Sequence, residues 1–440
     1  MKFGETAEQA FKAERIAKAE TGFCPLPWIH LSANTDTSMR VCCNTDHGGH
    51  VRNERGEIVY LSDLKSAREA MNQETHKSLR LAMLAGERPD FCKRCYIEED
   101  HGAVSIRQIY LRHFSTVLDS AVSEAMASDN SGEIDPRITY VDFSLSNNCN
   151  LKCRMCSPHS SYPLLAEFKD LGLHYSPDQA EKANRGWNFD ENLGRIAAEV
   201  VPYLTEMLTT GGEPFLSQQH YKILEMCVAQ GRSHEVVLRY HSNLTVLPER
   251  LLKIWRLFRK VEIHVSLEGV GEVNEYVRYP AKWSQIQANL RVLQSLRSEI
   301  KMHVEIHTCL QAISWLRLGE LLHWVAKTSI ELEGLFPRIP YPIWIDQPSE
   351  MTLLALPPKF RELGAKRVLQ ELDWIEPMFE DGRSPDFEFG SAKSFRAAIS
   401  RLLAAPFNEN DFRMFLERTN GVDRFRGQSL AAVMPEITGQ

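Results

Sequence analysis

The sequence has no long apolar run and no concentrated basic segment. Nowhere do about 18 apolar residues follow one another, the length that a helix needs to span a bilayer. Residues 1–20 contain no apolar core of a secretory signal. The formal net charge of −7 is spread over stretches of mixed sign, so duplex nucleic acid is not an expected partner, although a compact RNA substrate stays open. We therefore predict a cytoplasmic protein without a membrane partner.

Repeats of fixed period and low-complexity tracts are also missing. The chain has 440 residues, of which 43% are hydrophobic and 25% charged, which is ordinary for folded proteins and enough for more than one domain. Ten cysteines are present, and eight of them lie before position 157. In a reducing compartment, clustered cysteines indicate metal binding rather than a disulfide framework.

Changes of pattern divide the chain into three predicted regions. Residues 1–130 combine helical patterns with short β-like runs and end at the polar stretch SDNSGEIDP. Residues 137–345 alternate short apolar strands with helical patterns, the rhythm of a parallel sheet with crossover helices. Residues 346–440 are mostly helical in pattern. The prediction is an α/β fold with a cysteine-rich α+β N-terminal domain and a mostly helical C-terminal extension.

The first region contains several predicted elements. WIHLSA and MRVCCN read as short strands, and helices are predicted over residues 7–20, 63–73, 75–86 and 104–127, the second of them capped by Ser62.

Three cysteines fall within the eight positions of CNLKCRMC, directly after the predicted strand ITYVDFSLS. A loop at the carboxyl end of a barrel strand is where α/β barrels build active sites. A structural zinc site needs four ligands, whereas a cubane iron–sulfur cluster held by three cysteines keeps one iron open to substrate or cofactor. The alternative is a structural metal knuckle that a distant cysteine completes.

This motif resembles the CxxxCxxC of radical S-adenosylmethionine (SAM) enzymes, which lies at this point of a partial (β/α)6 TIM-type barrel. The resemblance implies that Cys149, Cys153 and Cys156 hold a [4Fe–4S] cluster that binds SAM. Met155 stands where the family often has an aromatic residue, and it is apolar enough to lie beside adenine.

Three later segments resemble the SAM-binding motifs of the same family. They are GGEPF, SNLT and VSLEGVGEVNEYVRYPAKW. The resemblance implies that the methionine amino group contacts Gly211, Gly212, Glu213 and Pro214, that Asn243 contacts the ribose, and that Ser266 and Arg278 hold the methionine carboxylate. Glycines permit close backbone approach and a carboxylate suits an ammonium group, while GGEP by itself would also suit a β-turn. Glu268 replaces the usual aspartate of the last segment.

Three predicted strands carry polar side chains on one face. Because side chains alternate along a strand, this face holds Arg239, His241, Asn243, Glu262, His264, Ser266, Glu268, His303, Glu305 and His307. A polar interior predicts a hydrated cavity for a polar substrate. The catalytic candidates are Arg239, His264, His303, Glu305 and His307, through hydrogen bonding or acid–base chemistry. A mononuclear metal on the last three, or a structural polar network, is the alternative.

A second group of cysteines lies in the first region, at Cys24, Cys42, Cys43, Cys92 and Cys95. Four of these five suffice for a zinc ion or a fully ligated cluster. FCPLPWIHLSANTDTSMRVCC and ERPDFCKRC resemble the SPASM auxiliary-cluster module, or its short form called twitch, here placed before the barrel. The resemblance implies an auxiliary [4Fe–4S] cluster and favours Cys42 over Cys43, with zinc as the alternative. Cys227 and Cys309 lack cysteine neighbours and are expected to be buried packing residues.

The function that the resemblance implies is reductive cleavage of SAM followed by hydrogen abstraction from a polar substrate, which is oxidoreductase-type chemistry. It also implies an electron donor such as flavodoxin or ferredoxin. A peptide is the expected substrate, and a small-molecule dehydrogenase or isomerase acting on a sugar, aminoglycoside or nucleotide is the alternative. A second alternative is a non-catalytic metal-binding adaptor that keeps the barrel as a scaffold.

Overall fold

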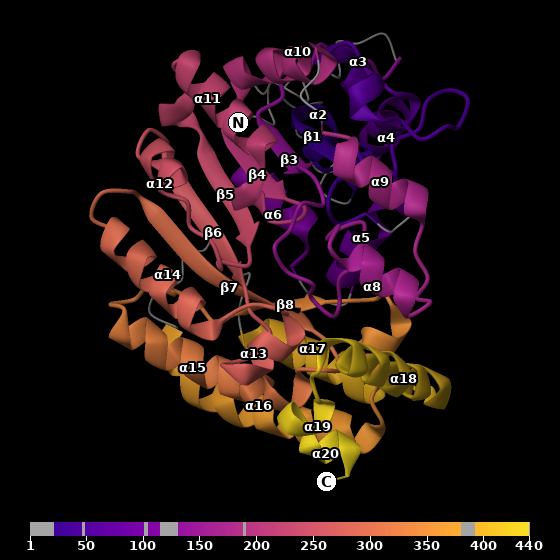
Figure 1. Cartoon of the computed structure of the whole chain (residues 1–440). Coiled ribbons are helices and arrows are strands. Elements are labelled where there is room, and N and C mark those ends of the chain that lie inside the picture. Colours follow the sequence, from indigo (N-terminus) through magenta and orange to yellow (C-terminus); the bar gives the residue numbers. More distant parts are fainter. Residues whose placement is uncertain are drawn as a thin grey trace, which may run out of the picture.

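A single eight-stranded sheet runs through the protein (Figure 1). The computed structural model describes residues 22–45, 49–100, 104–114, 131–187, 191–379 and 392–439. The strands are β1 His30–Ala33, β2 Met39–Arg40, β3 Tyr140–Ser144, β4 Glu206–Thr210, β5 Val237–Ser242, β6 Lys260–Ser266, β7 Met302–Leu310 and β8 Tyr341–Trp344. They are ordered β2-β1-β3-β4-β5-β6-β7-β8, and every pair is parallel except β1 with β2. The prediction of an α/β fold is confirmed.

Strands β3 to β8 follow one another both in sequence and in space, with helices between them. Helices α10 Glu191–Val200, α11 Gln218–Ala229, α12 Glu249–Trp255, α14 Trp283–Leu296 and α15 Leu318–Glu331 lie in these connections. The edge strands β2 and β8 do not pair with each other in the described part of the chain, so the sheet is open. This is a repeated βα arrangement in which the carboxyl ends of six consecutive strands meet along one edge.

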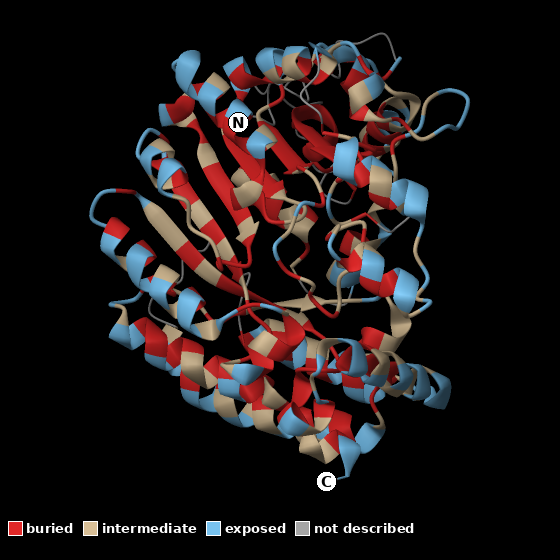
Figure 2. Ribbon diagram, viewed as in Figure 1, coloured by how far each residue is buried: buried red, intermediate tan, exposed pale blue. Residues whose placement is uncertain are grey.

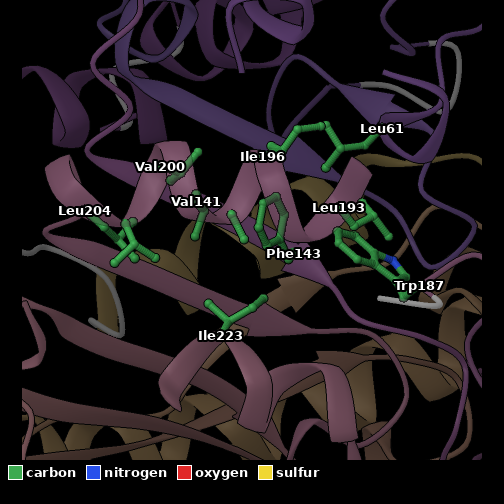
Figure 3. A pocket seen from close by; sticks show the side chains of 11 residues that line it. Leu61, Val141, Phe143, Trp187, Leu193, Ile196, Val200, Leu204 and Ile223 are labelled. Carbon is green, nitrogen blue, oxygen red and sulfur yellow. The ribbon is translucent and has the colours of Figure 1, made fainter. Parts of the chain in front are cut away.

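The two faces of the sheet differ in polarity, as the alternation predicts. Val261, Ile263 and Val265 of β6 are fully buried, whereas the side chains between them are only half-buried. The ribbon is accordingly coloured as buried along much of the sheet (Figure 2). On the outer face, α10 packs on β3 around a small pocket (Figure 3). Its lining is entirely apolar and includes Val141, Ile196 and Trp187. That pocket belongs to the packing between sheet and helix and offers no group for chemistry.

The N-terminal region shares this sheet. Strand β1 pairs with β3 from His30 opposite Tyr140 to Ala33 opposite Phe143, so hydrogen bonds connect the two sides of the predicted boundary at residues 128–136. Around β1 and β2 lie the helices α2 Leu26–Ile29, α3 Ala67–Met71, α4 Glu74–Leu84, α5 Lys93–Asp100 and α6 Ile106–His113. Because this region contributes strands to the common sheet, the structure does not set it apart as a domain of its own. A separate N-terminal cysteine-rich domain stays a prediction.

Several predicted elements of this region differ in detail. Ser62 does not cap a helix, because its hydroxyl lies 2.9 Å from that of Thr37 within a short 3₁₀ helix. Ser66 caps α3 instead, accepting a hydrogen bond from the Glu69 amide at 3.0 Å. The predicted strands are shorter than expected, since WIHLSA begins in α2 and MRVCCN contributes only Met39–Arg40.

The predicted helix over residues 75–86 is confirmed as α4. The one predicted over 104–127 is described only as α6 Ile106–His113, and the one over 7–20 lies outside the described residues.

The C-terminal region is helical, as predicted. It consists of α16 Pro358–Phe379, α17 Ala392–Ala404, α18 Glu409–Arg426, α19 Leu430–Val433 and α20 Pro435–Thr438, and it lies below α13 Glu272–Val277 and β8 in the view of Figure 1. The buried Arg361 joins its two proline-containing turns by donating to the carbonyls of Leu356 at 2.6 Å and Ala405 at 2.7 Å. None of the described helices is both long and apolar enough to cross a membrane.

The buried His30 makes the stability of this sheet sensitive to acid. Burial lowers the pKa of His30 from 6.5 to about 3, so its contribution to folding is complete above pH 6.5 and is lost as the pH falls toward the folded value. His30→Phe, which keeps the stacking on Tyr140, should reduce the loss of unfolding free energy between pH 6.5 and pH 4 by up to about 3 kcal/mol. Urea unfolding across this pH range measures the effect. The same curve in His30→Phe and in the exposed control His174→Phe would contradict it.

Candidate active site

The three cysteines of CNLKCRMC come together at the carboxyl edge of the sheet. Leu151, Cys153 and Ala281 form a small buried cluster, against which Cys149 and Cys156 pack. Cys153 is buried and the other two cysteines are partly accessible. The loop after β3 therefore presents three thiols around one apolar base.

Gly211 and Gly212 hold this loop in place. The Gly212 amide donates to the Ser146 carbonyl at 2.7 Å, and the Glu213 amide donates to the Asn148 carbonyl at 2.8 Å. A Cβ atom on Gly212 would lie 2.1 Å from the Asn148 oxygen, and one on Gly211, whose φ is +108°, would lie 2.6 Å from the Ser146 oxygen. The close approach that these glycines allow is thus an approach to the cysteine loop itself.

The Glu213 carboxylate ties the glycine segment to the end of β5. It accepts hydrogen bonds from the Asn243 amide at 2.9 Å, the Ser242 hydroxyl at 2.9 Å and the Phe215 amide at 3.2 Å. Burial raises the pKa of Glu213 to about 7. Its oxygens are engaged within the protein, and a contact of Glu213 with the SAM amino group stays a prediction.

Asn243 lies beside the cysteine loop. Its side-chain amide donates to the Asn150 side-chain oxygen at 3.0 Å, and the same nitrogen is 4.0 Å from the Cys149 sulfur. Asn150 in turn donates to the Thr245 hydroxyl at 2.7 Å. The SNLT segment and the three-cysteine loop therefore form one hydrogen-bonded unit.

Arg278 places a buried positive charge next to the thiols. Its guanidinium forms an ion pair with Glu268 at 2.5 Å, and Nη1 lies 3.8 Å from the Cys153 sulfur. A hydrogen bond with Cys156 and then the Arg278 charge lower the pKa of Cys153. The Nε atom of Arg278 is buried and has no hydrogen-bond partner among the described residues. Glu268, whose role the sequence left open, thus orients Arg278.

One of the two isolated cysteines is misplaced by sequence reasoning. Cys227 is fully buried, as expected. Cys309 is only partly buried, and it lies close enough to Cys153 and Arg278 for their charges to act on it. Its amide donates to Glu268 at 2.9 Å. Strand alternation carries the signal that was missed, because Cys309 continues the polar face of His303, Glu305 and His307.

Sequence reasoning also missed Asp423 of α18. The Arg154 guanidinium, between two cysteines of the motif, donates to Asp423 Oδ1 at 2.5 Å and lies 3.7 Å from the centroid of the Tyr276 ring. The Tyr276 hydroxyl donates to the same oxygen at 2.9 Å, and the Leu430 amide donates to Oδ2 at 2.7 Å. The C-terminal extension is thereby fixed to the cysteine loop by a buried ion pair.

The polar inner face separates into two groups. Arg239 lies between Glu206 at 2.7 Å and Glu262 at 2.6 Å, toward the amino ends of the strands. Farther along, His264 is hydrogen-bonded to His241 at 3.2 Å and stacks on His307 at 4.2 Å between ring centroids. The other candidates also meet, because His303 lies 2.6 Å from Glu305, which is 3.6 Å from His307.

Four of the five N-terminal cysteines are mutually close. Burial raises the pKa of Cys24, and the neighbouring thiolates of Cys92, Cys42 and Cys95 raise it further. Asn44 donates a hydrogen bond to the Cys95 sulfur at 3.3 Å. Cys43 differs, because its side chain is exposed and because, after burial, Asp142 of β3 is the largest influence that raises its pKa.

In the described part of the chain, neither cysteine group has three sulfur atoms close enough together to share one metal ion without some rearrangement of the side chains.

Residues 143–309 match the family model described as the Radical SAM superfamily. The chain contains a radical SAM domain. The match extends from β3 into β7 and includes the cysteine loop, the glycine segment and Arg278. The radical SAM domain is that of an enzyme, and its family's cofactors are SAM and a [4Fe–4S] cluster.

Several solved structures are distantly similar to this chain. Native anSMEcpe with bound AdoMet is 17% identical over 58% of this chain and 64% of its own, with a TM-score of 0.39. SuiB of Streptococcus suis bound to S-adenosylmethionine is 11% identical over 69% of this chain and 64% of its own, with a TM-score of 0.35. The chain thus spans less than two thirds of the length of either. At these TM-scores neither similarity supports an argument about function, and no curated protein matches the chain.

If the Arg154–Asp423 ion pair holds the three-cysteine loop in place, removing it should weaken both folding and iron binding. Asp423→Asn leaves the buried guanidinium without its counter-charge and should lower the unfolding free energy by about 3 kcal/mol. It should also reduce the iron retained on the three-cysteine loop, because the backbone between Cys153 and Cys156 loses its anchor. Thermal unfolding and iron analysis after anaerobic reconstitution measure both effects. Asp411→Asn is the matched control, because Asp411 lies in the same helix and, among the described residues, its side chain accepts one hydrogen bond, from the Ser349 hydroxyl at 3.3 Å. Equal behaviour of the two variants would refute the role.

Proposed function

We propose that this protein is a radical SAM enzyme that removes a hydrogen atom from a polar substrate, with a peptide as the preferred substrate class. In this proposal Cys149, Cys153 and Cys156 hold the [4Fe–4S] cluster. The observation that carries the proposal is the gathering of three thiols from one loop beside an amide, Asn243, and a buried guanidinium, Arg278. When bound, such a cluster supplies the electron that cleaves SAM into methionine and a 5′-deoxyadenosyl radical.

The donor set fits this cofactor pair. Three thiolates leave one iron of a cubane cluster without a protein ligand, which is where SAM binds in the proposal. The nearest carboxylates are engaged, because Glu213 accepts three protein hydrogen bonds and Glu268 pairs with Arg278. Neither is therefore free to serve as a fourth ligand.

The chain's own residues bind and orient the reacting groups. Arg278 carries an unpartnered Nε–H, which offers a donor to the methionine carboxylate together with the Ser266 hydroxyl. Asn243 is positioned by Asn150 to contact the ribose, and the segment Gly211 to Pro214 borders the amino group. The buried packing of Leu151 and Ala281 excludes water from the sulfur side of the loop.

The inner face of the sheet supports a polar substrate. His264 and Glu305 lie opposite each other on neighbouring strands, one side-chain layer below the proposed SAM contact Ser266, and His307 lies opposite Ser266. A peptide presents such groups with amides and side chains to bond. Sugars, aminoglycosides and nucleotides would also fit this chemistry and are the alternative substrates. SuiB is known bound to its precursor peptide SuiA, but at a TM-score of 0.36 that similarity does not decide the substrate of this chain.

We also propose that Cys24, Cys42, Cys92 and Cys95 bind an auxiliary [4Fe–4S] cluster. Their mutual electrostatic influence supports this assignment. Cys43, the next residue to Cys42, is influenced by Asp142 of the inner face, so the cluster would lie near the substrate cavity. Such a cluster would supply a site for electron transfer near the substrate, and flavodoxin or ferredoxin is the proposed external donor.

Iron analysis and SAM cleavage test the catalytic assignment. The reconstituted wild type should hold about eight irons per chain, about four for each cubane cluster, and should form 5′-deoxyadenosine when reduced. The variant with Cys149, Cys153 and Cys156 all changed to Ala should keep about four irons and form none, whereas Cys227→Ala should match the wild type. A wild type that binds only zinc would overturn the radical assignment and favour a metal-binding adaptor.

Neighbouring cysteines provide a matched test of the auxiliary cluster. Cys42→Ala should lower the iron content from about eight to about four per chain, and Cys43→Ala should leave it at about eight. Iron and zinc are counted in the same samples by elemental analysis. Zinc in place of the second group of irons would make the N-terminal site structural and remove the electron relay, and a loss of iron only in Cys43→Ala would exchange the two assignments.

A further inference from the structure

Three histidines from adjacent strands meet on the inner face of the sheet. His241 of β5 lies opposite His264 of β6, and His307 of β7 lies opposite Ser266, one side-chain layer farther along. One ring nitrogen from each histidine lies within 4.8 Å of those of the other two. The three rings form a single cluster, with centroid separations of 4.2, 4.8 and 5.0 Å.

His307 is the unusual member of this cluster. Its side chain is almost completely buried, and neither of its ring nitrogens has a hydrogen-bond partner among the described residues. The Glu305 carboxylate lies 3.6 Å from Nε2, which is too long for a hydrogen bond. A buried imidazole is normally satisfied at one nitrogen at least, so an unsatisfied ring aimed into a histidine cluster points to a bound species.

We propose that His241, His264 and His307 form a second metal site, which binds a divalent cation of borderline softness such as Zn²⁺. Three imidazoles are a ligand set that zinc uses in catalytic sites, and they leave a fourth position for water or substrate. Ion binding does not depend on the proposed radical function. Only the further step, in which the substrate offers an oxygen or nitrogen to the fourth position, rests on it.

The geometry is close to what an ion requires. With Zn–N distances of about 2.1 Å, two ligating nitrogens lie about 3.4 Å apart, and His264 Nδ1 and His241 Nε2 are separated by 3.2 Å. The rings of His264 and His307 are stacked within 7° of parallel, so their lone pairs do not converge as they stand. His307 can rotate about its second side-chain torsion, because that torsion is broad and no hydrogen bond restrains the ring.

A neighbouring carboxylate can orient one of the three ligands. The Glu305 carboxylate lies 3.6 Å from His307 Nε2, so rotation of the ring toward it would form the hydrogen bond by which carboxylates orient metal-binding histidines. Glu305 also contacts His303 at 2.6 Å and Arg338 at 3.7 Å, which fix its position.

Two of the three histidines lie one side-chain layer below the proposed SAM contacts, and His307 is level with Ser266. Asn243 follows His241 by two residues on one strand, and Ser266 follows His264 by two residues on the next. Side chains two residues apart share one face of the sheet. A substrate atom held by the ion would therefore lie under the place where the deoxyadenosyl group is generated in the proposed reaction.

Zinc binding to the reconstituted full-length protein tests the proposal. Iron fills the cysteine sites first, and the protein is then incubated with Zn²⁺, desalted and analysed for zinc and iron. We expect about one zinc per chain, with an X-ray absorption spectrum showing nitrogen and oxygen neighbours and no sulfur. His307→Gln and His264→Gln should each weaken zinc binding at least tenfold, and Glu305→Gln should weaken it about 10- to 100-fold.

His323→Gln is the matched control, because His323 lies on α15, contacts Glu371 at 3.1 Å and is outside the cluster. It should retain zinc. No zinc in the wild type, a sulfur-containing zinc environment, or equal losses in His323→Gln and His307→Gln would each overturn the site. Iron content and circular dichroism show whether a variant is folded, and His241→Gln serves if His307→Gln is not. A protein that forms no 5′-deoxyadenosine but binds zinc on nitrogen would retain the metal site and lose only the radical function.

Discussion

The backbone contact between Gly212 and Asn148 fixes the position of the whole site. No side chain separates the two loops, since even a Cβ atom would lie 2.1 Å from the Asn148 oxygen. Two amide hydrogen bonds of 2.7 and 2.8 Å close this contact. From there, Glu213 reaches the end of β5 and Asn243 reaches back to Asn150. Three consecutive strand ends are thus connected around the cysteine loop before any cofactor binds.

A second set of contacts holds the same loop from the opposite direction. Arg154 donates to Asp423, and Arg418 of the same helix donates to the Arg154 carbonyl at 3.3 Å. Arg426 and Glu167 form a further ion pair at 2.7 Å in which both side chains are almost completely buried. Buried charges of this kind are costly unless every partner is in place. The helical extension is therefore part of the architecture of the site.

Sequence patterns predicted what is local in this structure. The strands β3 to β7 were predicted from their apolar alternation, and the cysteine spacing of CNLKCRMC identified the loop after β3. Both signals are properties of short segments. The polar face of β5 to β7 also follows from alternation. Alternation does not give the register between strands, however, and register is what brings His241 to His264 and separates His303 from both. The short strand β8 was not predicted, since YPIW has no alternating polar pattern.

Long-range contacts account for the other differences. The place of β1 beside β3 depends on pairing between residues more than a hundred positions apart, and periodicity within a segment says nothing about such pairing. The pairing of Arg154 with Asp423 could not be predicted from the sequence either. An arginine and an aspartate 269 residues apart look like surface charges. The glycines show a different limit. Their presence was correctly connected with close approach, but the neighbour they approach is the loop before Cys149, which only three dimensions reveal.

That separation along the chain also sets an order of events in the cell. During translation the cysteine loop leaves the ribosome long before Asp423 is made, so the loop is at first tied only to the strand ends that precede and follow it. The anchor on its other side forms once residue 423 has emerged. An iron–sulfur assembly factor would therefore meet a less restrained loop on the nascent chain than on the finished protein.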